Sequence, residues 1–254
     1  LSRPAQGRTR MTAAPLPPGT MARLGAIVPP ANPAAEPELH ALTGRTAVLH
    51  VARLPVLPGD LRARCQGYGA AYPEAVRAFG ELDLAAIGIA FMSATYRDGP
   101  VADAALCRRL TDAAGCPVAT ASLAVTEALR ALGARRIALV SPYPDWLTAW
   151  SRGYWQQGGF EVAALTTMGD VFRAYDASED ELAAAIAAVG STEVDAVLLT
   201  GTGAYTLGAL QRIGADQRGC YLTSNVCLAW WLMRTAGLAQ APLLAAINPD
   251  LAAR

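Results

Sequence analysis

Short apolar runs alternate with longer stretches rich in Ala, Leu and Arg from residue 22 onward. The short runs are bounded by turn-forming residues, whereas the longer stretches place apolar residues at helical spacing. This alternation is typical of βα units built around buried parallel strands, and it predicts an α/β protein. We expect strands at 24–28, 47–51, 85–91, 118–120, 137–140, 161–165, 196–199 and 221–223. The helices expected between them span 61–82, 101–114, 123–132, 146–157, 178–189, 206–213 and 226–236.

The chain also contains an internal repeat. The segment Ala22–Pro30 returns as Ala134–Pro142, a shift of 112 residues (134 − 22). Asp83, before one apolar run, returns as Asp195 before another at the same shift (195 − 83). Two similar halves predict two pseudo-symmetric lobes, each a parallel sheet flanked by helices, with a cleft between them.

The lobes are expected to share the chain unequally. We place the first lobe at residues 21–118 plus 224–254 and the second at 119–223, because the last predicted helix returns to the first lobe. Residues 1–20 are rich in Pro, Gly, Thr and Arg without an apolar period, which predicts a disordered extension.

Ligands of open parallel sheets bind outside the carboxyl ends of the strands, where loops meet helix N-termini. The residues at these positions are small and hydroxylated, and exposed amides with hydroxyl groups form anion-binding sites. We expect the loops 29–32, 92–95, 141–143 and 200–203 to converge on one cleft, with 92–95 facing 200–202 as two anion holes. The remaining loops of this kind are 120–122 and 223–225.

The composition of the chain excludes several classes of partner and cofactor. The formal charge is zero, so no surface that attracts polyanions is expected and nucleic acid is not an expected partner. All 21 basic residues are Arg, which excludes a lysine Schiff base and hence covalent pyridoxal phosphate chemistry. The five Cys and two His lack metal-ligand spacing, so we expect no metal and a reduced, cytoplasmic protein. No apolar run is long enough to span a bilayer, and no membrane partner is expected.

Four motifs carry a resemblance to a known family. They are Gly25–Asn32 with Glu36 and Glu38, Ser141–Tyr143, Leu198–Gly203 with Thr206, and Thr223–Asn225 with Trp230 and Arg234. Over residues 21–238 the chain resembles the aspartate/glutamate racemase superfamily, and within it the arylmalonate decarboxylase and maleate cis-trans isomerase branch. The resemblance implies the same two-lobed fold.

The resemblance also implies chemistry without a cofactor. Members of this superfamily use one or two cysteines, one in each half, as acid and base beside a carboxylate held in an anion hole. In this chain Ser93 stands at the place of the first cysteine and Gly201 at the place of the second. A serine hydroxyl is a far weaker acid than a thiol, so cysteine-dependent racemisation or isomerisation is not expected here.

The anion hole can survive without the cysteines. The favoured interpretation is a cofactor-independent lyase or isomerase that binds a small (di)carboxylate in an oxyanion pocket between the lobes. One alternative is a small-carboxylate-binding homologue with altered or lost catalysis. Another is a hydrolase or hydratase that uses Ser93 or a pocket water, although neither His40 nor His50 falls on the cleft loops to act as a base. A homo-oligomer is left open.

Candidate residues follow from the loops and the resemblance. Cys227 is added as an acid because a helix N-terminus lowers the pKa of a thiol, and Asp170 or a bound water are further proton sources. Arg97, just beyond the first anion loop, could bind a second carboxylate or be solvated. The other four cysteines are expected to lie outside the site. The catalytic candidates are Ser93, Tyr143 and Cys227, and the substrate-binding candidates are Pro30, Asn32, Ala94, Thr95, Gly201, Thr202, Ser224 and Asn225.

Overall fold

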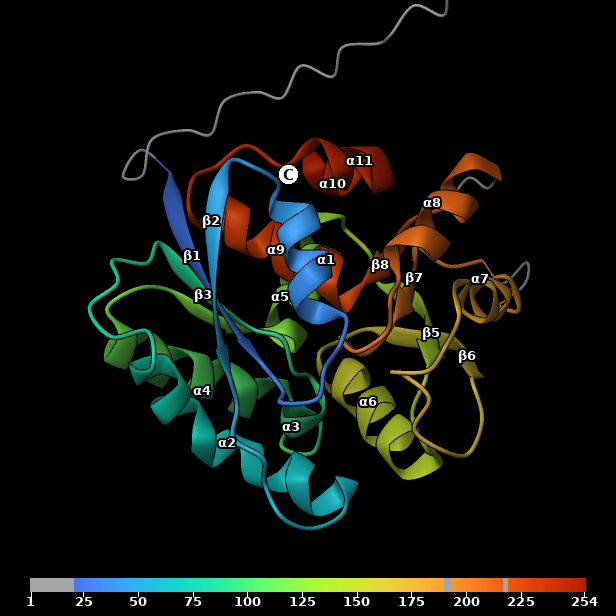
Figure 1. The fold of residues 1–254 in the computed structure, drawn as a ribbon. Coiled ribbons are helices and arrows are strands. Elements are labelled where there is room, and N and C mark those ends of the chain that lie inside the picture. Colours follow the sequence, from blue (N-terminus) through green and yellow to red (C-terminus); the bar gives the residue numbers. More distant parts are fainter. Residues whose placement is uncertain (1–20, 190–192, 217–218) are drawn as a thin grey trace, which may run out of the picture.

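The structure is a computed structural model that describes residues 21–189, 193–216 and 219–254. Two four-stranded parallel sheets flanked by helices make up this part of the chain (Figure 1). The expected α/β class and two-lobed architecture are thus confirmed. The extension expected at residues 1–20 lies outside the described residues.

Each sheet is built from one half of the repeat. The first half contains β1 (Ala22–Val28), α1 (Ala35–Thr43), β2 (Ala47–Arg53), α2 (Leu61–Arg77), β3 (Ala86–Ile89), α3 (Ser93–Tyr96), α4 (Gly99–Ala114), β4 (Val118–Thr120) and α5 (Ala121–Ala131). The second contains β5 (Arg136–Ser141), α6 (Asp145–Gln157), β6 (Glu161–Thr167), α7 (Glu179–Ala187), β7 (Ala196–Leu199), α8 (Leu207–Asp216) and β8 (Tyr221–Thr223). The chain closes with α9 (Ser224–Thr235), α10 (Pro242–Ile247) and α11 (Pro249–Ala252).

The strand orders of the two sheets match. The first sheet runs β2-β1-β3-β4 and the second β6-β5-β7-β8, so every strand has its counterpart four strands later. The repeated segments begin β1 and β5, which occupy the same central position. The equivalent strands β4 and β8 both end in a threonine, Thr120 or Thr223, whose hydroxyl caps the following helix.

Side chains of the first sheet alternate between its two faces. On β1, Leu24 and Val28 belong to the large core that contains α1, α5 and α9, whereas Ile27 packs with α2 and α4 on the opposite face. On β3, Gly88 lies against α9, where a Cβ would stand 2.9 Å from Leu228 Cδ1. A glycine therefore lets α9 approach this sheet closely.

One expected helix end is wrong, and we propose a different boundary between the lobes. β4 pairs with β3 and α5 packs against β4, α4 and α9, so the first sheet and its helices extend beyond the boundary expected at residue 118. We therefore propose that the first lobe continues through α5. The helix expected over 61–82 ends at Arg77, because the chain turns through Gly80 at φ +61°.

Two buried carboxylates connect the lobes. Asp103 of α4 accepts hydrogen bonds from Thr120 Oγ1 at 2.9 Å and from Tyr154 of α6, in the second lobe, at 2.7 Å. Glu38 of α1 accepts from the backbone N–H of Leu207, at the start of α8, at 2.9 Å. Burial raises the pKa of both carboxyls, that of Asp103 to about 6. In the described part of the chain, no helix is long and apolar enough to span a membrane.

Candidate functional site

A cavity of about 210 Å³ lies where the loops after β1, β3, β5 and β7 meet. The four loops expected to converge do so here, with contributions from both lobes. Two other segments complete the wall, the first turns of α2 and the loop between β6 and α7. The lining residues are Pro29, Pro30, Ala31, Asn32, Leu61, Arg64, Cys65, Tyr68, Phe91, Met92, Ser93, Tyr143, Phe172, Ala174, Tyr175, Gly201, Thr202 and Gly203.

The loop after β1 is held by a guanidinium and by its own asparagine. Arg53 at the end of β2 donates to the carbonyls of Pro29 and Pro30, both at 3.3 Å. Asn32 Oδ1 accepts from the N–H groups of Ala34 and Ala35 and so caps the start of α1. These contacts fix the Asn32 side chain at the cavity wall before any ligand binds.

Asn32 also ties the two lobes together through Thr202. Its Nδ2 donates to Thr202 Oγ1 at 3.0 Å, and that hydroxyl donates to the carbonyl of Ala90 at 2.7 Å. The proton of the Thr202 hydroxyl is therefore committed to the protein. Thr202 lines the cavity as expected, but in this arrangement its hydroxyl positions loops and cannot donate to a ligand.

Ser93 lies at the cavity wall in the first turn of α3. Its Oγ accepts a hydrogen bond from Cys65 Sγ at 3.3 Å, and both residues are buried from bulk solvent. Ser93 receives this bond, so its own proton is free to point into the cavity. Sequence reasoning placed Cys65 outside the site, and the structure brings it in.

Tyr143 reaches the cavity from the loop after β5. Its ring stacks on Phe172 with centroids 6.2 Å apart. Burial raises the pKa of its hydroxyl well above the usual value, so the group is a neutral donor at ordinary pH. Gly201 lies beside it at φ +92°, and a Cβ there would stand 2.9 Å from the Tyr143 hydroxyl oxygen. The absence of a side chain at Gly201 leaves room for this tyrosine.

The cavity has aromatic walls and a single charged side chain in its described lining. Tyr68 and Phe91 pack edge to face on the first-lobe side at 5.1 Å, and Phe172 and Tyr175 do so on the second-lobe side at 5.0 Å. Arg64 of α2 supplies the positive charge. The wall thus combines an anion partner with apolar surface, a combination suited to a small carboxylate that carries an apolar group.

Several expected site residues lie behind the cavity wall instead. Thr95 donates to the carbonyl of Met92, Ser224 to Met92 Sδ, and Asn225 to Glu38 and to the carbonyl of Thr202. Ala94 packs with the core on the α2 side of the first sheet. None of these four residues belongs to the cavity lining. The hydroxyls of Thr95 and Ser224 and the Nδ2 of Asn225 already donate within the protein, so these side chains support the loops that line the cavity.

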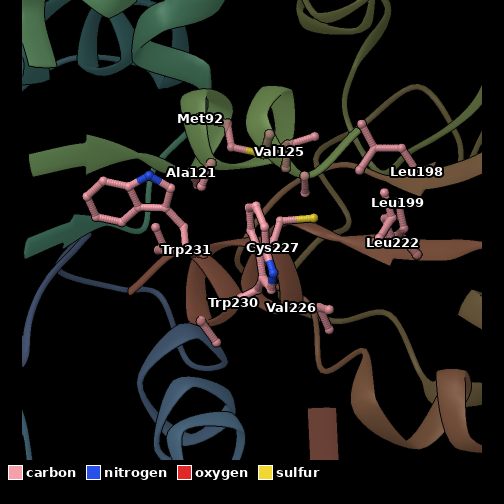
Figure 2. Close-up of a cluster of buried hydrophobic side chains, with 14 of the residues drawn as sticks. Met92, Ala121, Val125, Leu198, Leu199, Leu222, Val226, Cys227, Trp230 and Trp231 are labelled. Carbon is pink, nitrogen blue, oxygen red and sulfur yellow. The ribbon is translucent and has the colours of Figure 1, made fainter. Parts of the chain in front are cut away.

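Cys227 does not fit the acid role expected for it. The side chain is fully buried among Leu199, Leu222, Val226 and Trp230, away from the cavity lining (Figure 2). Burial raises the pKa of its thiol well above the usual value, which outweighs any effect of the nearby helix N-terminus. Two other expectations also fail to reach the cavity, since Arg97 pairs with Asp98 and Asp170 is exposed.

The residues that sequence reasoning missed come from α2 and from the loop before α7. Arg64, Cys65 and Tyr68 lie on one face of α2 at positions i, i+1 and i+4, which the sequence presents as an ordinary amphipathic helix. Phe172 and Tyr175 flank a loop that has no strand-end signal. An aromatic pair in a Gly-containing loop next to Asp170 was the available hint.

Comparison with known proteins identifies the family of the chain. The sequence model of the family described as "Arylmalonate decarboxylase" matches residues 24–245. A search of the curated proteins found no match.

No group of three or more His, Cys, Asp or Glu in the described chain is placed to hold a metal ion.

Solved structures of similar fold come from the same branch. A Cys-to-Ala variant of the maleate isomerase Iso from Pseudomonas putida S16 with maleate aligns with TM-score 0.83 at 21% identity, over 91% of this chain and 98% of that one. A Cys-to-Ser mutant of the Nocardia farcinica maleate cis-trans isomerase, with a covalently bound succinylcysteine intermediate, gives 0.82 at 20% identity over 92% and 99%. An arylmalonate decarboxylase gives 0.75 at 21% identity over 90% and 98%.

Proposed function

Because the chain belongs to the arylmalonate decarboxylase family, we propose that it is a cofactor-independent decarboxylase or isomerase of a small carboxylate, acting in the cavity between the lobes. The observation that carries the proposal is the composition of the cavity wall. It places Arg64, the Ser93 hydroxyl and the neutral Tyr143 hydroxyl around one space with aromatic side chains on both sides.

The aromatic walls favour a particular substrate shape. Maleate, which is present in one similar structure, is small and has no apolar substituent to contact Tyr68, Phe91 or Phe172. An arylmalonate has a ring that can pack on such surfaces and two carboxylates that can meet Arg64 and the hydroxyl donors. We therefore rank decarboxylation of a substituted malonate above isomerisation of maleate.

The proposed chemistry rests on charge stabilisation. Loss of carbon dioxide from a malonate leaves an enediolate, whose negative charge lies on the remaining carboxylate. Preorganised donors such as the Tyr143 hydroxyl stabilise such charge, and one donor of this kind contributes about 3–4 kcal/mol to the transition state. A hydrolase is less favoured, because no histidine lines the described cavity to activate Ser93.

The test is direct assay with matched controls. The protein is incubated with phenylmalonate, methyl(phenyl)malonate and maleate, and products are followed by proton NMR as phenylacetate, 2-phenylpropionate and fumarate. Turnover of the malonates is expected, with Tyr143→Phe about 10²-fold slower in kcat. Cys116→Ser, at a residue outside the cavity wall, should match the unmodified protein.

Two negative results have different meanings. If phenylmalonate raises the melting temperature but is not turned over, the protein is a carboxylate-binding homologue and the enzyme proposal fails. If no malonate binds at millimolar concentration, the cavity is not a carboxylate site.

The five cysteines form no disulfide, which favours a reducing cytoplasm as the proposed compartment.

A further inference from the structure

One cysteine of the chain lines the cavity. Cys65 lies in the second turn of α2, is 1% exposed, and donates its S–H hydrogen bond to Ser93 Oγ at 3.3 Å. The other cysteines are placed elsewhere, namely Cys107 beside Asp103, Cys227 in the core, and Cys116 and Cys220 outside the cavity wall. The thiol at the cavity wall therefore belongs to helix α2 and not to either of the two loops after β3 and β7.

We infer that Cys65 is the acid of this site and that its proton reaches the substrate through the hydroxyl of Ser93. The inference rests on the proposed function, because it assigns the proton source for the same decarboxylation. It answers the difficulty that Ser93 alone is a weak acid. The direction of the observed bond, from sulfur to oxygen, is the direction that proton delivery requires.

The surroundings of Cys65 suit an acid better than a nucleophile. Burial raises the pKa of its thiol, so the group stays protonated at neutral pH. Arg64, the next residue toward the N-terminus and also part of the cavity wall, favours the thiolate that remains after the proton has left. The thiol is therefore protonated before the transfer, and Arg64 offsets part of the cost that burial and the nearby Asp60 impose on the thiolate after it.

The proton transfer balances as follows for a substituted malonate. The bond between the α-carbon and one carboxylate breaks, carbon dioxide leaves, and the electron pair is shared between the α-carbon and the remaining carboxylate. The Ser93 hydroxyl proton moves to the α-carbon while the Cys65 thiol proton moves to the Ser93 oxygen. No free alkoxide forms, and the negative charge ends on the Cys65 sulfur, which water reprotonates after the product leaves.

The experiment compares Cys65→Ser, Ser93→Ala and the double variant on phenylmalonate, with Cys116→Ser as the control. Cys65→Ser keeps a hydroxyl donor of similar size but removes the acidic thiol, so kcat should fall by about 10²-fold or more with little change in KM. Because the two groups act in series, the double variant should be no slower than Ser93→Ala. Stabilisation by phenylmalonate should persist in Cys65→Ser, which shows that the pocket still binds.

The pH profile separates an acid from a structural residue. Measured from about pH 6 to about pH 11, kcat should stay level until the pH approaches the raised pKa of the thiol and then fall as the thiol ionises, and Cys65→Ser should lack this fall. If Cys65→Ser and Cys65→Ala retain full kcat and the same profile, or if the effects of Cys65 and Ser93 multiply, the relay is overturned while the decarboxylase proposal stands. If the unmodified protein turns over none of the malonates, both are overturned.

Discussion

Replacement of Asp103 by Asn should change how the stability of the protein depends on pH. The carboxyl of Asp103 is 2% exposed and accepts hydrogen bonds from Thr120 and Tyr154, which join α4 to β4 and to the second lobe. Burial is the main cause that raises its pKa from 3.8 to about 6. The difference corresponds to about 3 kcal/mol in favour of the protonated form in the folded state.

The sign follows from proton binding. Between pH 3.8 and about 6 the folded protein holds the Asp103 proton more tightly than the unfolded chain does. The contribution to the free energy of unfolding is therefore fully present below about pH 4 and is lost as the pH rises to about 6. In Asp103→Asn the side chain cannot ionise, so this decline disappears.

The measurement is urea unfolding of both proteins at several pH values from about 4 to about 7.5. The unfolding free energy of the unmodified protein minus that of Asp103→Asn should fall by about 2.5 kcal/mol across this range. Subtraction removes the contribution of Glu38, whose pKa is also raised. The hydrogen bond from Tyr154 lowers the pKa of Asp103, so its loss in Tyr154→Phe should raise that pKa further and extend the decline to higher pH. A difference that is flat or rises with pH would refute the reasoning.

Three further predictions concern the cavity. Ser93→Cys should fold normally and raise the turnover of phenylmalonate if a thiol on this loop can act as the acid. Gly201→Cys should lose about 1–3 kcal/mol of stability, because position 201 has a positive φ and lies beside the Tyr143 hydroxyl. Thermal melts compare the two variants, and equal melting temperatures would contradict this reasoning. Arg64→Ala should raise the KM for phenylmalonate about 10-fold or more, while Arg77→Ala, at the exposed end of the same helix, should leave it unchanged. Steady-state kinetics measure both values, and equal KM values for the two variants would show that Arg64 is not part of the site. Iodoacetamide should label Cys65 slowly, and phenylmalonate should protect Cys65 from labelling. Peptide mass spectrometry follows the labelling, with Cys116 as the unprotected reference. If phenylmalonate does not slow the labelling of Cys65, the thiol lies outside the binding space.

The sequence by itself determined the architecture. The repeat at a spacing of 112 residues predicted two like sheets, and the strand orders match element for element. Local features of this kind include the capping box of Ser178 and Glu181, three residues apart at the start of α7. Such features depend on neighbours in the chain and on the period of apolar residues, which the sequence states directly.

The sequence also located the four loops that line the cavity, because the carboxyl ends of parallel strands meet at one edge of a sheet. It could not decide which side chains on those loops face the cavity. Thr95 and Asn225 carry the polar groups expected of a binding site, yet their hydroxyl and amide groups donate to Ser122 of α5 and Glu38 of α1, which come from distant parts of the chain.

Only the tertiary structure decided which thiol belongs to the site. Cys65 and Cys227 both lie early in a helix, so sequence position does not separate them. The packing of α2 against α3 brings Cys65 to Ser93, whereas α9 is enclosed by α1, α5 and β3 and buries Cys227. Whether a cysteine meets a cavity or a core depends on what covers its helix, and contacts between elements distant in the chain determine that.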